Sequence, residues 1–401
     1  MSELNSAQLL GERPVADMGR MMSRGIMFGA IGIAGTIAGY FMADRSQFFQ
    51  SYLIAYMFWM GISLGSLLLL MVQYLSGGAW GLVARRIFES GARTLPLMAV
   101  LFLPIAFNLE TLYSWARPEA ATDTIIQSKA AYLNPQFFYT RAILYFVIWF
   151  VLTTILTRWS RSQDETPPQP PGPLDRRFRV LSGPGIVLTV LTVTFMSVDW
   201  VMSLDPHFYS TIFGILTLGG AGLSTLAFTI LVLQGLKQSQ PMSQVANVER
   251  FHDFGKLMLA FVMLWAYFNV SQLLIIWSAN LPEEIPWYLE RLRGPWAPWS
   301  WLVLLGHFVL PFVLLLSRDI KRHSRVLAGV AYFVLLMRVV DFIWTVGPVF
   351  RHDTTFHWLD FTIPLAFAAP WLFMFYRNLG QQSLVPANDP YFKEAVADGG
   401  H

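Results

Sequence analysis

The sequence predicts an all-α polytopic membrane protein with ten transmembrane helices. Charged residues make up 13% of the 401 residues and hydrophobic residues 55%, whereas soluble domains carry about 25% charged residues. A helix crosses a bilayer with about 20 apolar residues, and the apolar runs here are continuous rather than alternating, which excludes a barrel of strands. The composition also excludes a disordered chain, a disulfide scaffold and an ordinary cytosolic enzyme.

Along the chain, a polar N-terminal segment (1–24) precedes the first four spans (25–158), and a proline-rich linker (159–179) containing PPQPPGP separates these from the last six spans (180–379). An amphipathic outer loop (280–297) interrupts the second group, and a polar tail (380–401) ends the chain. The third and ninth spans are the least apolar because each contains a charged residue. The ten spans are expected at about 25–42, 51–75, 94–112, 138–157, 180–203, 209–236, 254–278, 298–317, 326–346 and 358–376.

Ten spans place both termini on the same side of the membrane, and the basic residues predict which side this is. Twenty of the 28 basic residues lie in the terminal segments and in the loops on the same side as them. The positive-inside rule therefore predicts that both termini are cytoplasmic. The N-terminus, with Glu3, Glu12 and Asp17, lacks the pattern of a removable signal peptide.

A short internal similarity indicates two related halves. Val198-Asp199-Trp200 ends the fifth span and Val340-Asp341-Phe342 ends the ninth, and both helices run outward. Four spans separate the two sequences, which favours two four-helix bundles, spans two to five and six to nine, with spans one and ten at the periphery.

Ionisable residues inside the spans are candidate functional residues, because a charge at membrane depth costs about 3 kcal/mol or more. Candidates for a proton path in the outer half and middle of the membrane are Glu110, Asp199, His307, Arg338, Asp341 and Asp360. Candidates for a cytoplasmic proton entrance, at the start of the seventh span, are His252, Asp253 and Lys256. A quinone headgroup needs an apolar slot with one or two hydrogen-bond partners, and the polar residues for such an outer-half pocket are Glu110, Arg141, Asp199, Asn269 and Gln272.

Structural roles remain open for several of these residues. Arg338 and Asp341 are three residues apart and can form an intrahelical salt bridge. Asp360 can cap the tenth helix, and His307 can be a hydrogen-bonded core residue. The group at 252–256 can be a solvated helix start, although a histidine titrating near neutrality also suits a proton entrance.

Two stretches carry a more specific resemblance. They are SVDWVMSLDPHFYST (197–211) and the run from FHDFGKL (251–257) through LWAYF (264–268) to NLPEEIPWY (280–288). Both resemble the ActF subunits of alternative complex III, the bacterial quinol:electron-acceptor oxidoreductase, and more widely the NrfD or polysulfide-reductase type of membrane subunits. The resemblance extends over essentially the whole chain, and Asp199, His252, Asp253 and Lys256 are positions within its motifs.

This resemblance implies a subunit of a respiratory or photosynthetic quinol:cytochrome c or cupredoxin oxidoreductase in the bacterial inner membrane. The implied partners are a homologous ten-span membrane subunit, an iron–sulfur subunit, haem c subunits and small membrane anchors, with no nucleic acid. Quinone or menaquinone is the implied ligand, haem c and iron–sulfur clusters lie on partner subunits, and this chain carries no redox centre of its own and is not catalytic by itself. The absence of cysteine is consistent with this, since iron–sulfur and covalent haem c sites need cysteine.

Three functions follow for comparison. In the first, the chain contributes a transmembrane proton path coupled to quinol oxidation in sister subunits. In the second, it binds quinol in its own outer-leaflet pocket. In the third, it is a stand-alone secondary transporter, for which Ser182-Gly183-Pro184-Gly185 is the nearest equivalent of an interrupted helix. A purely structural scaffold with every buried charge paired is a fourth reading.

Overall fold

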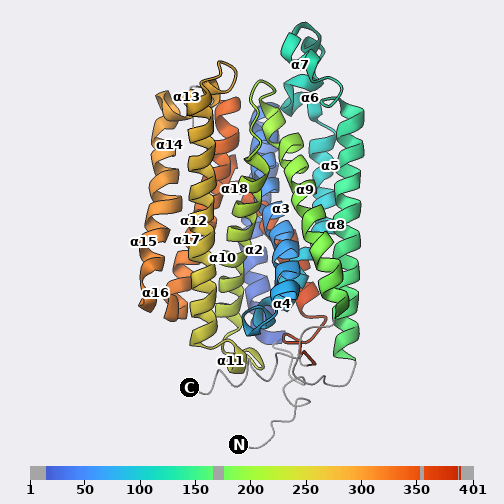
Figure 1. The fold of residues 1–401 in the computed structure, drawn as a ribbon, viewed down its shortest axis with the longest axis vertical. Helices are drawn as coiled ribbons and strands as arrows, with labels where there is room; N and C mark the ends of the chain where they lie inside the picture. Colours follow the sequence, from blue (N-terminus) through green and yellow to red (C-terminus); the bar gives the residue numbers. More distant parts are fainter. Residues whose placement is uncertain (1–14, 166–175, 353–355, 387, 390–401) are drawn as a thin grey trace, which may run out of the picture.

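The computed structural model describes residues 15–165, 176–352, 356–386 and 388–389 (Figure 1). Across these residues it contains no strand, and ten helical segments are long and apolar enough to cross a membrane. The predicted all-α polytopic fold class is therefore confirmed. The spans are α2 (Val15–Met42), α3 (Arg45–Ser76), α4 (Ala79–Ala92) with α5 (Leu95–Ala106), α8 (Pro135–Asp164), α9 (Arg176–Trp200), α10 (Phe213–Leu236), α12 (Val248–Ala279), α14 (Ala297–Leu302) with η5 (Val303–Val309) and α15 (Leu310–Leu316), α17 (Ser324–Val346), and α18 (Leu359–Leu379).

The third span differs most from its predicted position. It begins at Trp80 rather than at residue 94, and it ends at Ala106 rather than at residue 112. Charged residues on α4 lowered the hydropathy of the first half of this span, although those charges are buried and form ion pairs within α4, with α8 and with the C-terminal segment. At the other end, α5 stops two residues after Pro104, and Asn108 donates its amide N–H to the Pro104 carbonyl over 2.8 Å.

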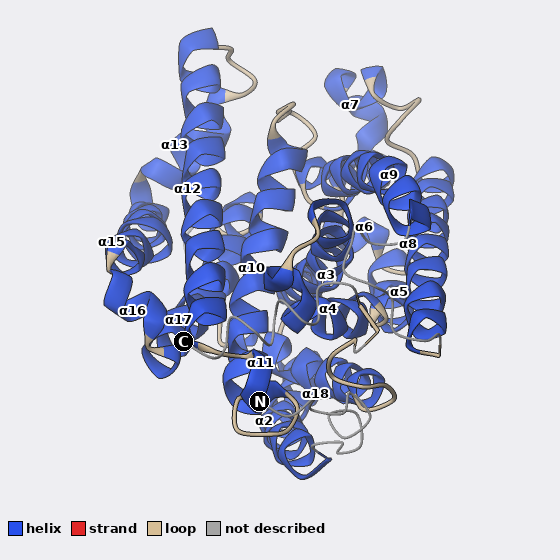
Figure 2. Cartoon of the chain, turned by 60° about the horizontal axis from the view of Figure 1, so that its bottom comes forward, coloured by secondary structure: helices blue, strands red, loops and turns tan. Residues whose placement is uncertain are grey.

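The two predicted four-helix bundles are present. In the first bundle, α3, α4–α5, α8 and α9 pack in a ring, and in the second bundle α10, α12, η5–α15 and α17 do the same. Seen with the bottom of the molecule forward, α12, α15 and α17 lie to the left of α10, and α5, α8 and α9 lie to its right (Figure 2). Helices α2 and α18 pack together outside both rings, as expected for the first and last spans.

Helices α3 and α10 join the two bundles and form the centre of the molecule. In the most apolar stretch of α3, 89% of the residues are buried, compared with 17% in α2 and 28% in α12. Helices that are apolar on every side are buried in this way. The outer helices instead expose apolar side chains such as Phe41, Tyr267 and Trp277, which suits contact with lipid.

Connecting segments lie at two opposite faces (Figure 1). The terminal face, where α2 begins and α18 ends, carries α11 (Met242–Val245) and α16 (Arg318–Arg322). The distal face carries α6 (Leu109–Leu112), η1 (Ser114–Ala116), η2 (Pro118–Thr122) and α7 (Thr124–Ser128), then η3 (Met202–Leu204), α13 (Ile285–Leu292), η4 (Gly294–Trp296) and η6 (Gly347–Val349).

The predicted amphipathic outer loop contains helix α13, and its apolar face packs on the chain itself. Trp287, Tyr288 and Arg291 are buried. Arg291 lies 3.5 Å from the centre of the Trp287 ring and donates to the carbonyl of Thr345 over 2.6 Å. Its burial lowers the pKa of Arg291 to about 9. This helix therefore closes the distal end of the second bundle.

The predicted linker between the fourth and fifth spans is shorter in the structure. Helix α8 continues to Asp164 and α9 begins at Arg176, so both helices extend into the predicted linker. The proline-rich centre of that linker, the first 14 residues and the last 12 lie outside the described residues. Residues 380–386 and 388–389 of the predicted C-terminal tail are described, and they pack against the terminal face of the first bundle.

A row of glycines on α2 allows α2 and α18 to pack closely. Gly25, Gly29, Gly32, Gly35 and Gly39 all face α18. A Cβ atom added at Gly32 would lie 2.3 Å from the backbone nitrogen of Ala366. Such close approach of backbones through small residues is a general way in which membrane helices associate.

Gly32→Leu is expected to push α2 away from α18 and lower the free energy of unfolding by about 1–3 kcal/mol, the usual cost of overpacking. The matched control is Gly329→Leu in α17, because nothing lies within 4 Å of a Cβ added there. Unfolding in increasing mole fractions of a denaturing detergent measures both variants. Equal stabilities of the two variants would contradict the close packing of α2 on α18.

Candidate functional site

The centre of the second bundle contains a buried ion pair. Arg338 and Asp341 pair one turn apart on α17, as their spacing predicted, and both are almost completely buried. Trp265 of α12 donates its indole N–H to Asp341 Oδ2 over 3.2 Å. The Arg338 guanidinium lies against Gly220 of α10, where an added Cβ would be 2.3 Å from Nη2. Three helices therefore enclose this pair, which we call the second-bundle ion pair.

His307 lies beside this pair on the fourth helix of the bundle. Its ring packs edge-on against Trp265, with ring centres 4.2 Å apart, and it is fully buried. Neither ring nitrogen has a hydrogen-bond partner among the described residues. A buried polar atom without a partner costs about 1–3 kcal/mol of folding free energy. An apolar side chain would fill this position without that cost, so packing alone does not account for a histidine here.

The helix around His307 is locally widened into the π-helical turn η5. Pro311 follows four residues after His307. Proline has no N–H to donate to the carbonyl four residues earlier, and its ring crowds that carbonyl. This spacing explains why the helix widens at His307, and π-helical turns occur frequently at functional sites.

The first bundle contains a second ion pair near the distal face. Arg141 of α8 binds Asp199 of α9 through two bonds, Nε to Oδ2 at 2.8 Å and Nη2 to Oδ1 at 2.9 Å. Tyr145 donates its hydroxyl to Asp199 Oδ2 over 2.7 Å. The Arg141 guanidinium also lies 3.8 Å from the centre of the Tyr132 ring. We call this the first-bundle ion pair, and its carboxylate is almost completely buried.

The predicted entrance residues lie together at the start of α12, on the terminal face. Asp253 pairs with Lys256 at 2.8 Å and with Arg250 at 3.3 Å, and His252 is half-buried beside them. Trp265 lies nine positions after Lys256 on α12, about 14 Å along the helix axis. The buried hydroxyls of α10, those of Ser224, Thr225 and Thr229, each bond to a carbonyl one turn earlier.

Two other predicted path residues lie away from these clusters. Asp360 of α18 pairs with Arg351 at 2.7 Å and accepts a bond from Ser51 of α3 at 2.6 Å, so it joins α18 to α3. Glu110 is exposed on the distal face in α6, beyond the end of the third span. The expectation that Glu110 lies inside a span was wrong, because α5 ends at Ala106.

The five residues predicted for a quinone pocket are not gathered in one place. Arg141 and Asp199 lie in the first bundle, whereas Asn269 and Gln272 lie on α12 of the second bundle. Gln272 accepts from Ser210 over 2.9 Å and donates to the Tyr288 hydroxyl over 3.2 Å. A mainly apolar pocket of about 290 Å³ does open beside α12, and Trp265, Asn269, Tyr288 and Trp344 are among its lining residues.

One buried charge cluster was missed by the sequence analysis. On the terminal face, Arg86 pairs with Glu89 at 2.8 Å and with Asp164 of α8, and Arg85 pairs with Asp389 of the C-terminal segment. Arg85, Arg86 and Glu89 are completely buried. We call these residues the terminal-face network. The sequence signal was the spacing of Arg86 and Glu89, three residues apart on one helix, which permits pairing.

Comparison with protein-family models and with curated proteins finds no match for this chain.

Proposed function

We propose that this chain is the integral membrane subunit of a quinol:cytochrome c or cupredoxin oxidoreductase, in which it provides a transmembrane proton path while sister subunits oxidise quinol. The observation that carries the proposal is the cluster of His307, Trp265, Arg338 and Asp341 in the centre of the second bundle. An ionisable group at membrane depth is a functional candidate by default, since lipid penalises it. Here the Asp341 carboxylate and the His307 imidazole both contact the indole ring of Trp265.

The positions of the family-like stretches support the same proposal. The stretch 197–211 contains Asp199 of the first-bundle ion pair, and the run 251–288 contains both the entrance residues and Trp265. The two regions that resemble alternative complex III subunits thus contain Asp199 toward the distal face, the entrance residues at the terminal face and Trp265, which donates to Asp341 at the centre.

In the proposed path, protons enter at His252, Asp253 and Lys256 and reach His307 and Asp341 in the second bundle. The interval of about 14 Å requires water or the α10 hydroxyls as carriers. Arg338 is the ion-pair partner of Asp341 in this path. A proton arriving from His307 neutralises Asp341 and weakens its hold on Arg338, which gives the site two distinguishable charge states.

Quinone binding by this chain is the second candidate. The observation that favours it is the pocket beside α12, whose apolar walls include Trp265, the residue that also donates to Asp341. A quinone ring in this pocket would lie next to the second-bundle ion pair. The hypothesis of a stand-alone transporter depended on an interrupted helix at Ser182-Gly183-Pro184-Gly185. Helix α9 continues through Pro184 without a break, so this feature no longer supports that hypothesis.

Mild purification tests the proposal against both alternatives. With an affinity tag on this chain in native membranes, we expect haem c and iron–sulfur absorbance to co-purify, together with oxidation of an added quinol by the eluted complex. An untagged strain processed in parallel controls for unspecific binding. A chain that elutes without redox centres, and that accumulates a solute when reconstituted in vesicles, would contradict the proposal in favour of a transporter.

A further inference from the structure

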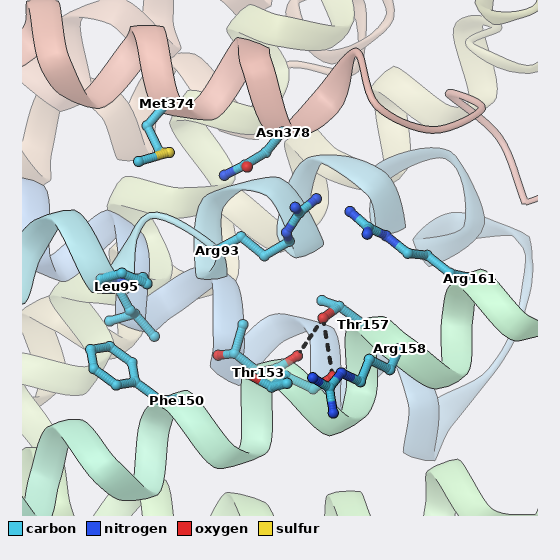
Figure 3. A pocket seen from close by; sticks show the side chains of 11 residues that line it. Arg93, Leu95, Phe150, Thr153, Thr157, Arg158, Arg161, Met374 and Asn378 are labelled. Atoms are coloured by element: carbon cyan, nitrogen blue, oxygen red, sulfur yellow. Dashed lines mark hydrogen bonds between the residues drawn. The ribbon is translucent and has the colours of Figure 1, made fainter.

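A pocket of about 340 Å³ with both polar and apolar walls opens on the terminal side of the first bundle, between α5, α8 and α18 (Figure 3). Its rim includes Arg93, from the junction of α4 and α5, and Arg158 and Arg161 from α8. The side chains of Arg93 and Arg161 point toward one another across this rim (Figure 3). Asn378, one residue before the end of α18, also lines the pocket, which places it near the membrane surface of the terminal face.

The three arginines carry positive charge that no described carboxylate neutralises by an ion pair. Gln381 is the shared partner: its Oε1 atom accepts from Arg93 Nη2 at 2.8 Å and from Arg161 Nη2 at 3.3 Å. The nearby Glu89 is already paired with Arg86 and accepts from Ser160 at 2.6 Å. Gln381 therefore places a neutral amide oxygen between two cations, and an anion that displaced this amide would neutralise their charge.

Two buried polar atoms on the pocket lining lack a partner among the described residues. They are Nη1 of Arg93 and the hydroxyl oxygen of Thr153, whose side chain is 95% buried. Buried donors are normally satisfied, and each exception calls for an explanation. An anion bound between the arginines would accept from the free Arg93 nitrogen and from the Thr153 hydroxyl.

The part of the pocket that lies deeper in the membrane is apolar, and this favours an anion that carries apolar chains. Leu95, Phe150 and Met374 line it, and Val147 and Val151 of α8 are exposed next to it on the lipid-facing surface. A free phosphate ion would gain nothing from these side chains, whereas the acyl chains of a lipid would cover them. Basic pockets between transmembrane helices on the cytoplasmic side are known to suit anionic lipid headgroups.

We infer that this pocket binds the headgroup of an anionic phospholipid. The phosphate lies between Arg93, Arg158 and Arg161, and the acyl chains run along Phe150 and the exposed side of α8. The inference is independent of the proposed function, because it needs only the orientation of the chain in a bilayer. It gives the terminal face a bound lipid that bridges α5, α8 and α18.

The test uses the delipidated full-length protein in a neutral detergent, with palmitoyl-oleoyl-phosphatidylglycerol as the probe. Native mass spectrometry counts retained lipids, and the thermal midpoint reports stabilisation. We expect one tightly held phosphatidylglycerol and a raised midpoint, with little effect of palmitoyl-oleoyl-phosphatidylcholine. Arg93→Gln combined with Arg161→Gln is expected to weaken retention about thirtyfold, at about 1 kcal/mol for each arginine.

A matched control separates a site from general attraction to a basic surface. Arg24→Gln combined with Arg179→Gln removes the same charge from exposed residues of the same face, and retention should stay within twofold of the unchanged protein. Equal loss in both double variants would overturn the inference. So would stabilisation by inorganic phosphate equal to that by the lipid, or no response to phosphatidylglycerol, which would point to an acidic segment of a partner protein. Arg93→Lys with Arg161→Lys keeps the charge and should retain the lipid, which guards against misfolding of the glutamine variant.

Discussion

Asp341→Asn is expected to remove proton movement along the proposed path of the reconstituted complex and to leave only the protons that quinol itself releases on oxidation, because a positioned acid–base group is lost. Asparagine can still accept the Trp265 N–H, but it neither binds nor releases a proton. It also leaves Arg338 as a buried charge without its only ion-pair partner among the described residues. The measurement is the number of protons moved per quinol oxidised in proteoliposomes, followed with a pH-sensitive dye. Quinol oxidation itself should continue, because the redox centres belong to other subunits in the proposed complex.

Two variants control this experiment. Asp360→Asn breaks an equally buried aspartate–arginine pair at the contact between α18 and α3, away from the second bundle, and it should leave the proton count per quinol unchanged. Asp341→Glu retains a titratable carboxylate and should restore measurable proton movement if the variant assembles. An unchanged proton count in Asp341→Asn, or an equal loss in Asp360→Asn, would remove Asp341 from the proposed path.

The sequence predicted the positions of nine spans well because each is a continuous apolar run of sufficient length. It misplaced the third span for a definite physical reason. Hydropathy treats Arg85, Arg86 and Glu89 as three separate penalties, but in the fold they neutralise one another and their neighbours on α8 and the C-terminal segment. A hydropathy sum over one helix does not include ion pairs that its residues form with distant segments of the chain.

Apart from the Arg338–Asp341 pair, the sequence analysis named single candidate residues and not the contacts between them. Asp199 and Arg141 were both identified from their depth, yet their bidentate pairing depends on how α8 packs on α9. The sequence analysis did not identify Trp265 as a partner of the second-bundle ion pair. Aromatic residues make up 15% of the sequence, so one more tryptophan does not indicate a functional position. The sequence did contain one unused signal, the proline four residues after His307, which predicts a disturbed turn at that histidine.

Arg86→Met is expected to be among the most destabilising single changes in the chain, with a loss of about 3–5 kcal/mol in the free energy of unfolding. Methionine fills similar space but leaves Glu89, which is completely buried, without its cationic partner. It also removes the donor to Ser160 at 2.9 Å and the partner of Asp164. Unfolding in a denaturing detergent, followed by tryptophan fluorescence, measures the change. Arg179→Met, at an exposed position on α9 of the same face, should change the stability by less than about 0.5 kcal/mol.

The double variant Arg86→Met with Glu89→Met tests whether Arg86 and Glu89 stabilise the fold mainly by neutralising one another or by separate interactions with their other neighbours. Removing both members of a buried pair is often neutral, because neither remaining side chain then needs solvation. We therefore expect the double variant to recover most of the stability lost in Arg86→Met, with Asp164 tolerated because its side chain is 27% exposed. If the losses of the two single variants instead add, Arg86 and Glu89 do not compensate one another. The charges on α4 would then need other partners to be stable within the third span.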